Sequence, residues 1–511
     1  MNSSRSQTLK APTALRAAVI VALCTALTSC NVGPKYLPPT ITAPPAFKEA
    51  PTESKEPGEW TVAQPQDATL RGKWWEIYNE PDLNALEEQL NVDNQNIRES
   101  FENFMEARAL VRETRSQLFP TLSVGPSYTR SQTSSNLGTG AIANNESGKQ
   151  SQVFSLPGEV SWEPDLWGKV RNAIRSSQYT AQASAADLEL ERLTEQASLA
   201  EYFFEIRGQD ALQQVLDNAV EADKKSLAAE QGRYDTGVDD EISLVQAQTT
   251  LAEAQSSAIN NHIARAQYEH AIAMLIGKQA SAFSIPAVAK TAAPPPIPVG
   301  VPSQLLERRP DVAAAERTMA SANAQIGVAY AAYYPSLTIS GSGGFESSAV
   351  GKLLDASSRF WSVGPAVSET VYDGGLRRAT VNQYIATYNA DLAAYRQSVL
   401  TAFQQVEDYL AAVRIFSQQI VRQKEAVEHS ETYLKLEQAR YDTGIDPYID
   451  LASAQITLYS NQQQLATIQV QQMTASVELI QALGGGWDKS QLPTPAQVTA
   501  KPSHAETTIQ H

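Results

Sequence analysis

The chain has 511 residues and a net charge of −16, from 40 Lys and Arg against 56 Asp and Glu. So acidic a protein repels nucleic acid and anionic membrane surfaces, which nearly excludes nucleic-acid binding. The only cysteines are Cys24 and Cys30, and the five histidines show no metal-ligand spacing. Beyond residue 30 the sequence therefore excludes disulfides, thiolate metal sites and cysteine nucleophiles, and we expect no metal and no cofactor.

Residues 1–29 are typical of an export signal. Three basic residues precede an apolar run, Ala17 to Leu27, that is too short to span a bilayer comfortably. The run ends in Leu-Thr-Ser-Cys, which resembles a bacterial lipobox, so we expect cleavage before Cys30 and lipid modification of that residue. An ordinary signal peptide that contains a cysteine by chance is the alternative. Residues 30–82 follow as an expected lipid-anchored, extended, proline-rich segment.

The two halves of the chain repeat the same motifs in the same order. Residues 233–239 read Arg-Tyr-Asp-Thr-Gly-Val-Asp, and residues 440–446 read Arg-Tyr-Asp-Thr-Gly-Ile-Asp, 207 positions later. Further matches occur in the same order along both halves. This period is too long for a solenoid, so the sequence indicates an internal duplication. We expect a first repeat at 83–283, a proline-rich linker at 284–310 and a second repeat at 311–487.

Each repeat begins with an expected helical segment, Leu83–Phe119 in the first and Asp311–Tyr334 in the second. Long helical stretches close each repeat. Residues 376–443 contain no Gly or Pro, which predicts a helix of about 100 Å. A second helix is expected over 447–484, and the first repeat has the same layout.

Gly237 and Gly444 follow the repeated Tyr-Asp-Thr motif, where they are expected to end one helix and reverse the chain. Each repeat therefore supplies a long antiparallel hairpin. A coiled-coil spacer is the simpler interpretation of such helices. No strict heptad persists, however, and small residues interrupt the apolar positions, which favours helices packed side by side in a wall.

Between the helices lie four segments in which apolar and polar residues alternate, near residues 119–130, 152–165, 334–346 and 359–371. One such segment would fit a half-buried soluble sheet equally well. Four of them on an exported, lipid-anchored chain favour a membrane β-barrel. Four strands cannot close a barrel, and open edges are not tolerated in lipid, so several chains must share one barrel. The fold class is therefore mainly α with a small transmembrane β part.

Several motifs resemble the outer-membrane efflux lipoproteins of the NodT/OprM type, which are TolC-like outer membrane factors. These motifs are Cys-Asn-Val-Gly-Pro from Cys30, Trp74-Trp75 and the run Glu307-Arg-Arg-Pro-Asp311. The resemblance implies a homotrimer with a shared twelve-stranded barrel in outer-membrane lipid, four strands per chain, above a periplasmic α-barrel of helical hairpins. It also implies a passive exit duct in a Gram-negative bacterium, docked to a periplasmic adaptor protein and an inner-membrane RND-type transporter.

The resemblance also implies a gate at the periplasmic turns of the hairpins. Asp446 and Asp450 occupy positions where the family places constriction residues. Carboxylates of several chains near one axis would repel each other and favour cations. Alternatively these acids cap helix N-termini, and both roles are compatible. The expected gate residues are Asp239, Asp240 and Glu241 in the first repeat and Asp446, Tyr448 and Asp450 in the second.

Other functions fit the sequence less well. An exit duct for a type I protein secretion system would share the architecture, and a periplasmic structural spacer would use the helices alone. No nucleophile elbow, phosphate-binding loop or metalloprotease motif indicates an enzyme. We expect the polar tail, 488–511, to be disordered.

Overall fold

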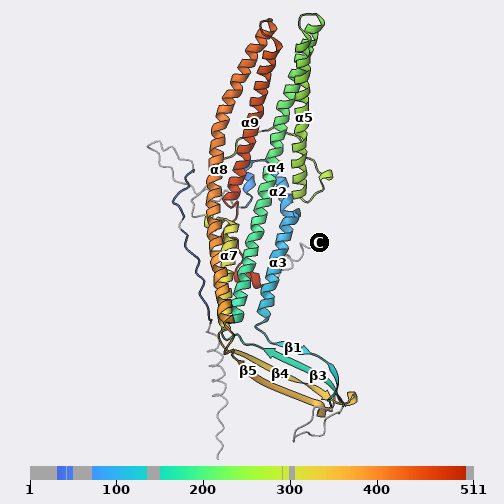
Figure 1. Cartoon of the computed structure of the whole chain (residues 1–511), viewed down its shortest axis with the longest axis vertical. Helices are drawn as coiled ribbons and strands as arrows, with labels where there is room; N and C mark the ends of the chain where they lie inside the picture. Colours follow the sequence, from blue (N-terminus) through green and yellow to red (C-terminus); the bar gives the residue numbers. More distant parts are fainter. Residues whose placement is uncertain are drawn as a thin grey trace, which may run out of the picture.

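The computed structural model describes residues 31–41, 43–49, 72–134, 150–290, 292–298 and 305–501. Cys30, and with it the lipidation prediction, lies outside these ranges. The molecule is long and narrow, with a β-sheet at one end and the turns of two helical hairpins at the other (Figure 1).

The two hairpins have matching dimensions. Helices α4 (Lys169–Asp235) and α8 (Leu376–Asp442) each contain 67 residues, and α5 (Glu241–Leu275) and α9 (Tyr448–Ala482) each contain 35. All four pairs of helix ends are 207 positions apart, the offset of the sequence motifs. Because α9 packs on α4, the hairpins form one row in the order α8, α9, α4, α5 (Figure 1).

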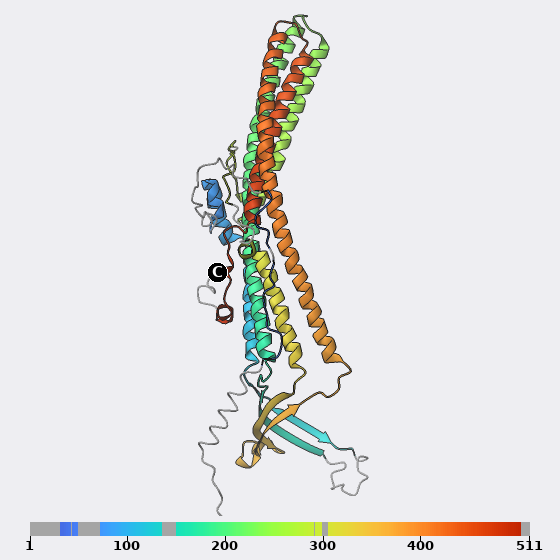
Figure 2. The ribbon, with the colours of Figure 1, turned by 90° about the vertical axis from the view of Figure 1, so that its left-hand side faces the viewer.

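Shorter helices thicken the half of this row that is nearer the sheet. Helix α3 (Gln95–Ser116) packs on α4, and α7 (Pro310–Ala331) lies between α4 and α8 (Figure 2). Helix α2 (Pro81–Asp93) is separate from α3, although the sequence favoured one unbroken helix from Leu83 to Phe119. The remaining elements are η2 (Trp74–Tyr78), η3 (Ala280–Ala282), α6 (Leu305–Arg308), η5 (Val350–Lys352), η6 (Ala356–Ser358), η7 (Lys489–Gln491) and α10 (Pro495–Thr499).

The sheet is antiparallel throughout. Its strands are β1 (Thr121–Val124), β2 (Ser127–Gln132), β3 (Gln150–Trp162), β4 (Ser336–Ser347) and β5 (Arg359–Ser368). Both β1 and β2 pair with the same side of β3, on either side of Gly125-Pro126, so together they act as one interrupted strand. Strands β3, β4 and β5 follow in order, which leaves the β1–β2 edge and the β5 edge without a partner strand within the described chain.

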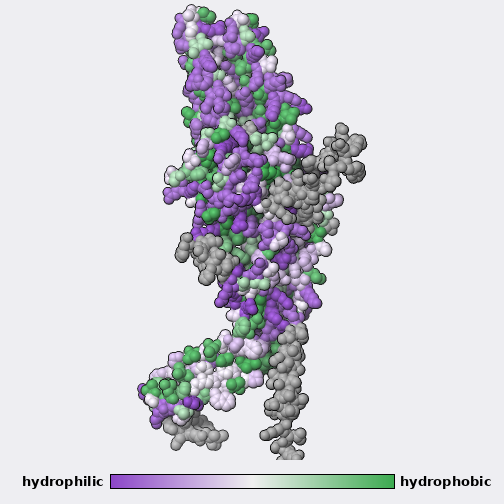
Figure 3. Space-filling model, turned by 180° about the vertical axis from the view of Figure 1, so that it is seen from behind, coloured by the Kyte–Doolittle hydropathy of each residue, from purple (hydrophilic) through white to green (hydrophobic). Residues whose placement is uncertain are grey.

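The pairing register sorts the side chains of the sheet onto two distinct faces. Leu122 lies opposite Val160, and Leu337 lies opposite Val367. The other face pairs serine with serine, as in Ser342 opposite Ser362. The apolar face is open: Leu122 is 74% exposed and Trp361 is 81% exposed. Figure 3 shows that hydrophobic surface is concentrated over the sheet, whereas the helical part is mainly hydrophilic.

The largest core cluster lies at mid-height, where α2 and η2 pack on α4, α5 and α9. Trp74, Leu83 and Leu90 are among its fully buried side chains. In the described ranges, no helix combines the length and apolar character needed to cross a membrane.

The expectation of a disordered tail is wrong for residues 488–501. Val498 of α10 is fully buried and clusters with Val111 and Ala181. The Arg108 guanidinium donates to the carbonyls of Gln497, at 3.3 Å, and Ala500, at 3.2 Å. Tertiary contacts with α3 and α4 therefore order this polar segment.

Candidate functional site

The two hairpin tips share one turn geometry. Gly237 and Gly444 adopt left-handed backbone conformations, with φ of +71° and +74°. In each turn the next residue donates its backbone N–H to a carbonyl five positions back, Val238 to Arg233 and Ile445 to Arg440, both at 2.9 Å. This bonding pattern satisfies the last carbonyls of α4 and α8, and it explains why glycine occupies both positions.

Each tip also contains an ion pair at equivalent positions. Arg440 donates to Asp446, with 2.8 Å between Nη2 and Oδ1. Arg233 lies 3.7 Å from Asp239, measured from Nε to Oδ2. The Arg440 bond holds the pKa of Asp446 below its ordinary value. Asp446 and Asp239 are therefore paired with basic residues inside the protomer, which reduces the repulsion they would exert on copies in other chains.

A buried polar contact joins the two hairpins just behind the tips. The Tyr441 hydroxyl of α8 donates to Glu230 of α4, and Glu230 is fully buried. The guanidinium of Arg233 lies over the Tyr441 ring, 4.6 Å from its centre. Burial, together with Asp239 nearby, raises the pKa of Glu230 to about 7, although Arg233 opposes the shift. The contact therefore binds one hairpin to the other through a titratable group.

The remaining predicted gate residues divide between exposed and buried positions. Asp240 caps α5 by accepting the Ser243 backbone N–H at 3.1 Å. In the second repeat the N-cap of α9 is Pro447, and neither Asp446 nor Asp450 caps the helix. Glu241 and Asp450 are exposed in the first turns of α5 and α9. Tyr448 is almost fully buried in a cluster with Tyr441, Leu451, Ala452 and Ala247, so in this protomer it packs the tip from within.

Sequence reasoning missed four residues of this contact network: Glu230, Arg233, Arg440 and Tyr441. The signal was present, because the repeated motif extends back to Glu230 in one half and to Glu437 in the other. The two glutamates differ in their surroundings. Desolvation raises the pKa of Glu437, and the neighbouring Asp446 adds to the shift. Only the folded structure shows that the first copy supplies its glutamate to the contact between hairpins and the second copy its tyrosine.

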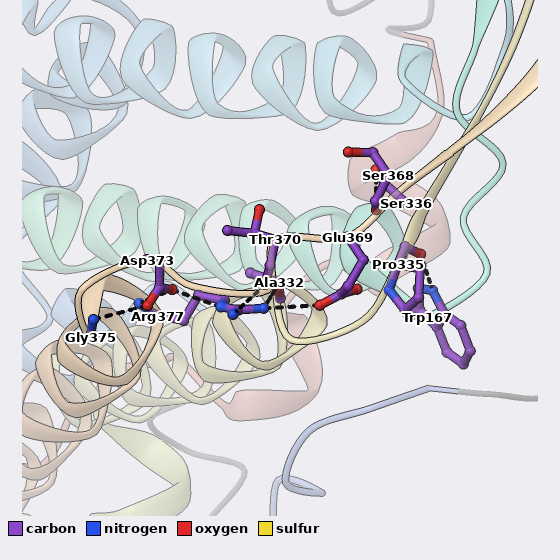
Figure 4. A network of polar contacts seen from close by, with 10 residues as sticks. All are labelled: Trp167, Ala332, Pro335, Ser336, Ser368, Glu369, Thr370, Asp373, Gly375 and Arg377. Carbon is purple, nitrogen blue, oxygen red and sulfur yellow. Dashed lines mark hydrogen bonds and ion pairs between the residues drawn. The ribbon is translucent and has the colours of Figure 1, made fainter.

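A second polar network fixes the sheet to the helices (Figure 4). Arg377, at the start of α8, donates to Asp373 at 2.7 Å, to Glu369 at 3.1 Å and to the Thr370 carbonyl at 2.6 Å. Trp167 donates to the Pro335 carbonyl at 2.7 Å, across the start of β4. The chain leaving β5 is thereby held in one conformation before the helix begins.

The N-terminal strap, residues 31–41 and 43–49, runs from this junction along the helices. Near the sheet, the Val32 backbone N–H donates to the Trp167 carbonyl at 3.1 Å. Farther along, Tyr36 donates to Glu316 of α7. At mid-height, the Glu407 carboxylate of α8 accepts the backbone N–H groups of Lys48, at 2.7 Å, and Glu49, at 2.9 Å. The strap therefore connects the sheet end of the molecule to α8.

A close backbone approach fixes the strap beside α7. Gly33 has φ of +128°, and a Cβ there would lie 2.6 Å from the Cα of Gly327. A Cβ on Gly327 would lie 2.5 Å from Nδ2 of Asn172. That side chain in turn donates to the Val32 carbonyl at 3.1 Å. Glycine at both positions lets the strap lie directly on the helix.

Within the described residues, no group of three or more His, Cys, Asp or Glu side chains is arranged to bind a metal ion. The polar networks at the tips and at the sheet junction instead connect helices to each other and to the sheet. Such an arrangement holds the two hairpins together and fixes the sheet to the helices.

Comparisons with known proteins fit this architecture. The family model described as "Outer membrane efflux protein" matches residues 86–278 and 301–485. The solvent efflux pump outer membrane protein SrpC of Pseudomonas putida is 30% identical over 475 residues, which cover 91% of this chain and 97% of SrpC. Outer membrane protein OprJ of Pseudomonas aeruginosa is 28% identical, over 92% of this chain and 96% of its own.

Solved structures of outer-membrane channels share the fold of this chain. The outer-membrane channel OprN aligns with a TM-score of 0.79 and 27% identity, over 90% of this chain and 100% of that one. The CmeC outer membrane channel of Campylobacter jejuni, at 21% identity, shares the fold with a TM-score of 0.80, over 90% of this chain and 96% of that one. The chain therefore belongs to the outer membrane efflux protein family and is an efflux channel of the Gram-negative outer membrane.

Proposed function

We propose that three copies of this chain form a passive exit duct. Their strands complete one shared twelve-stranded barrel, and the gate of the duct lies at the hairpin tips. The open, apolar-faced sheet is the observation that supports this most directly. Its β1–β2 edge and its β5 edge lack partner strands within the described chain, and its apolar face is exposed. Backbone groups left unpaired in lipid cost several kcal/mol each, so the sheet needs further copies to close it.

The helical row has free sides that suit the same assembly. Helices α5 and α8 lie at its two ends. Both expose large apolar side chains, including Ile259 and Ile263 on α5 and Leu400 and Leu436 on α8. If α5 of one copy packs on α8 of the next, these side chains leave water and the rows join into a closed wall.

The hairpin tips supply the surface that we propose for the periplasmic adaptor. Val238 and Ile242 in the first hairpin are exposed, and so are their equivalents Ile445 and Ile449 in the second. Apolar residues at the end of an otherwise hydrophilic helical row favour a protein partner there. We propose an inner-membrane RND-type transporter as the third component and energy source of the pump.

The transported molecules are proposed to be small and largely apolar. Relatives of this chain are named as outer membrane proteins of solvent, toluene and antibiotic efflux pumps. These names support small-molecule efflux over type I protein secretion.

We propose that Cys30 is the lipid-modified first residue of the mature chain. Two positions later, Val32 bonds to Trp167 beside the sheet, which would place an acyl chain at the membrane end of the molecule. Cells grown with labelled palmitate are expected to label the natural protein but not Cys30→Ser. Label in the variant would contradict the assignment.

The duct itself is tested by measuring the oligomeric mass of the detergent-purified protein and then its conductance in planar bilayers. A trimer with small, cation-selective, mostly closed currents is the expected result. A monomer without conductance would contradict the proposal and favour a structural spacer.

A further inference from the structure

The five described strands contain four charged side chains, and the sheet separates them by sign. Glu159 lies opposite Ser123, and Glu346 lies opposite Ser155, so both carboxylates are on the polar face. The remaining two, Arg130 and Arg359, are on the apolar face. Arg130 lies opposite Gln152, next to the Tyr128–Phe154 pair, and Arg359 lies opposite Phe345.

Both arginines are at the end of the sheet that is far from the helices. Arg359 begins β5 after the β4–β5 turn, and Arg130 lies two residues before the end of β2. Aromatic residues accompany them on the same face: the Tyr128 and Phe154 rings are 4.7 Å apart, and Trp361 is two positions after Arg359. Aromatic residues mark the interface of a membrane barrel, so the two guanidinium groups lie at headgroup level.

The positive charge of these side chains is not neutralised by the neighbours that the structure describes. Arg130 donates to Oε1 of Gln150 at 2.8 Å, and that amide is neutral. Arg359 is exposed, and no carboxylate of the described chain forms an ion pair with it. In the β4–β5 turn, Lys352 and Asp355 contribute opposite charges that cancel. A cationic side chain on a lipid-facing surface is costly unless the headgroups provide a counter-charge.

We propose that Arg130 and Arg359 bind phosphate groups of the outer-leaflet lipid and so fix the depth and lipid environment of the barrel rim. This inference depends on the proposed function, because the helices must be periplasmic for this rim to face outward. Guanidinium groups donate two parallel hydrogen bonds to a phosphate, and their uncompensated positive charge favours lipids with anionic phosphate groups over zwitterionic lipids. The carboxylates on the other face would keep the same anions out of the lumen.

The test uses the full-length protein in nanodiscs of phosphatidylcholine containing a minor fraction of either diphosphoryl or monophosphoryl lipid A. Lipid retained by the protein is counted by native mass spectrometry. The test variant is Arg130→Gln with Arg359→Gln. The matched control is Glu159→Gln with Glu346→Gln, which changes the same number of charges on the opposite face of the same strands.

The natural protein is expected to retain the diphosphoryl lipid in preference to the monophosphoryl lipid. The arginine variant should bind it about 25-fold more weakly, at about fivefold for each cation removed. The glutamate control should retain it, and millimolar inorganic phosphate should not displace it. Equal retention of the two lipids, equal loss in the control, or displacement by inorganic phosphate would overturn the inference.

Conductance recorded from the same nanodisc preparations after fusion with planar bilayers separates this inference from the proposed function. Normal currents without lipid discrimination refute only the phosphate site. Absence of both membrane insertion and current refutes the duct, and the phosphate site with it.

Discussion

Removing one hydroxyl group should loosen the closed tip. In Tyr441→Phe, the ring remains packed between Arg233 and Tyr448, but Glu230 loses its donor. The second carboxyl oxygen of Glu230 is already buried without a hydrogen-bond partner in the described structure. Leaving a buried polar group unsatisfied costs about 1–3 kcal/mol. If opening exposes Glu230 to water, the substitution destabilises the closed state by that free energy and leaves the open state unchanged. The ratio of open to closed channels then rises about 5- to 150-fold.

The chain offers a matched control for this experiment. Tyr234 occupies the equivalent position in the first repeat, but it is 41% exposed. Tyr234→Phe should therefore leave gating nearly unchanged. Open probability is measured from single-channel recordings in planar bilayers, after the oligomeric mass of each variant is verified. Unchanged gating in Tyr441→Phe, or an equal increase in Tyr234→Phe, would refute the claim that this hydrogen bond holds the tip closed.

Three further outcomes are expected. In this structure the pKa of Glu230 is raised to about 7, against an ordinary value of 4.5. If this conformation is the closed one, the closed tip holds the proton more tightly, so open probability should fall as the pH drops from 7 toward 4.5. Glu230→Gln should abolish that dependence. Asp446→Ala should raise the single-channel conductance a few-fold, because it breaks the ion pair with Arg440. Asp450→Ala should raise the conductance by a smaller factor. Unchanged currents in both variants would contradict this prediction. Gly327→Ala should release the strap and speed its proteolysis, whereas Gly351→Ala, with open space around its Cβ, should not.

The duplication, the hairpins and the alternating strands could be predicted because each depends on a local pattern. Helix breaks that depend on distant partners could not. Asn94 separates α2 from α3 because its side chain caps α3 while donating to the Leu275 carbonyl, at 2.9 Å, and to Glu195, at 3.1 Å. Neither partner is near in sequence, so absence of Gly and Pro alone indicated one helix.

The contact between the hairpin tips also depends on residues that are distant in sequence. The two copies of the Glu-x-x-Arg-Tyr motif are nearly identical in sequence, yet Tyr441 is 5% exposed and Tyr234 is 41% exposed. Both copies take part in the contact between the hairpins, but the first contributes Glu230 and Arg233 and the second contributes Tyr441. This division depends on α9 packing against α4, and no local pattern encodes it. The acids of the turns were found by position, but their arginine partners became apparent only in three dimensions.

The route of the strap has a consequence for biogenesis. Its side chains and backbone bond to residues about 280 and 360 positions later, Glu316 and Glu407. The N-terminus leaves the ribosome and the export machinery first, whereas its docking groove is completed only when α8 has been exported. If Cys30 carries the lipid that we propose, one end of the chain is fixed at a membrane while the strap still lacks its binding surface. A chain truncated before α8 would then lack Glu407 and leave the strap without its contacts at mid-height.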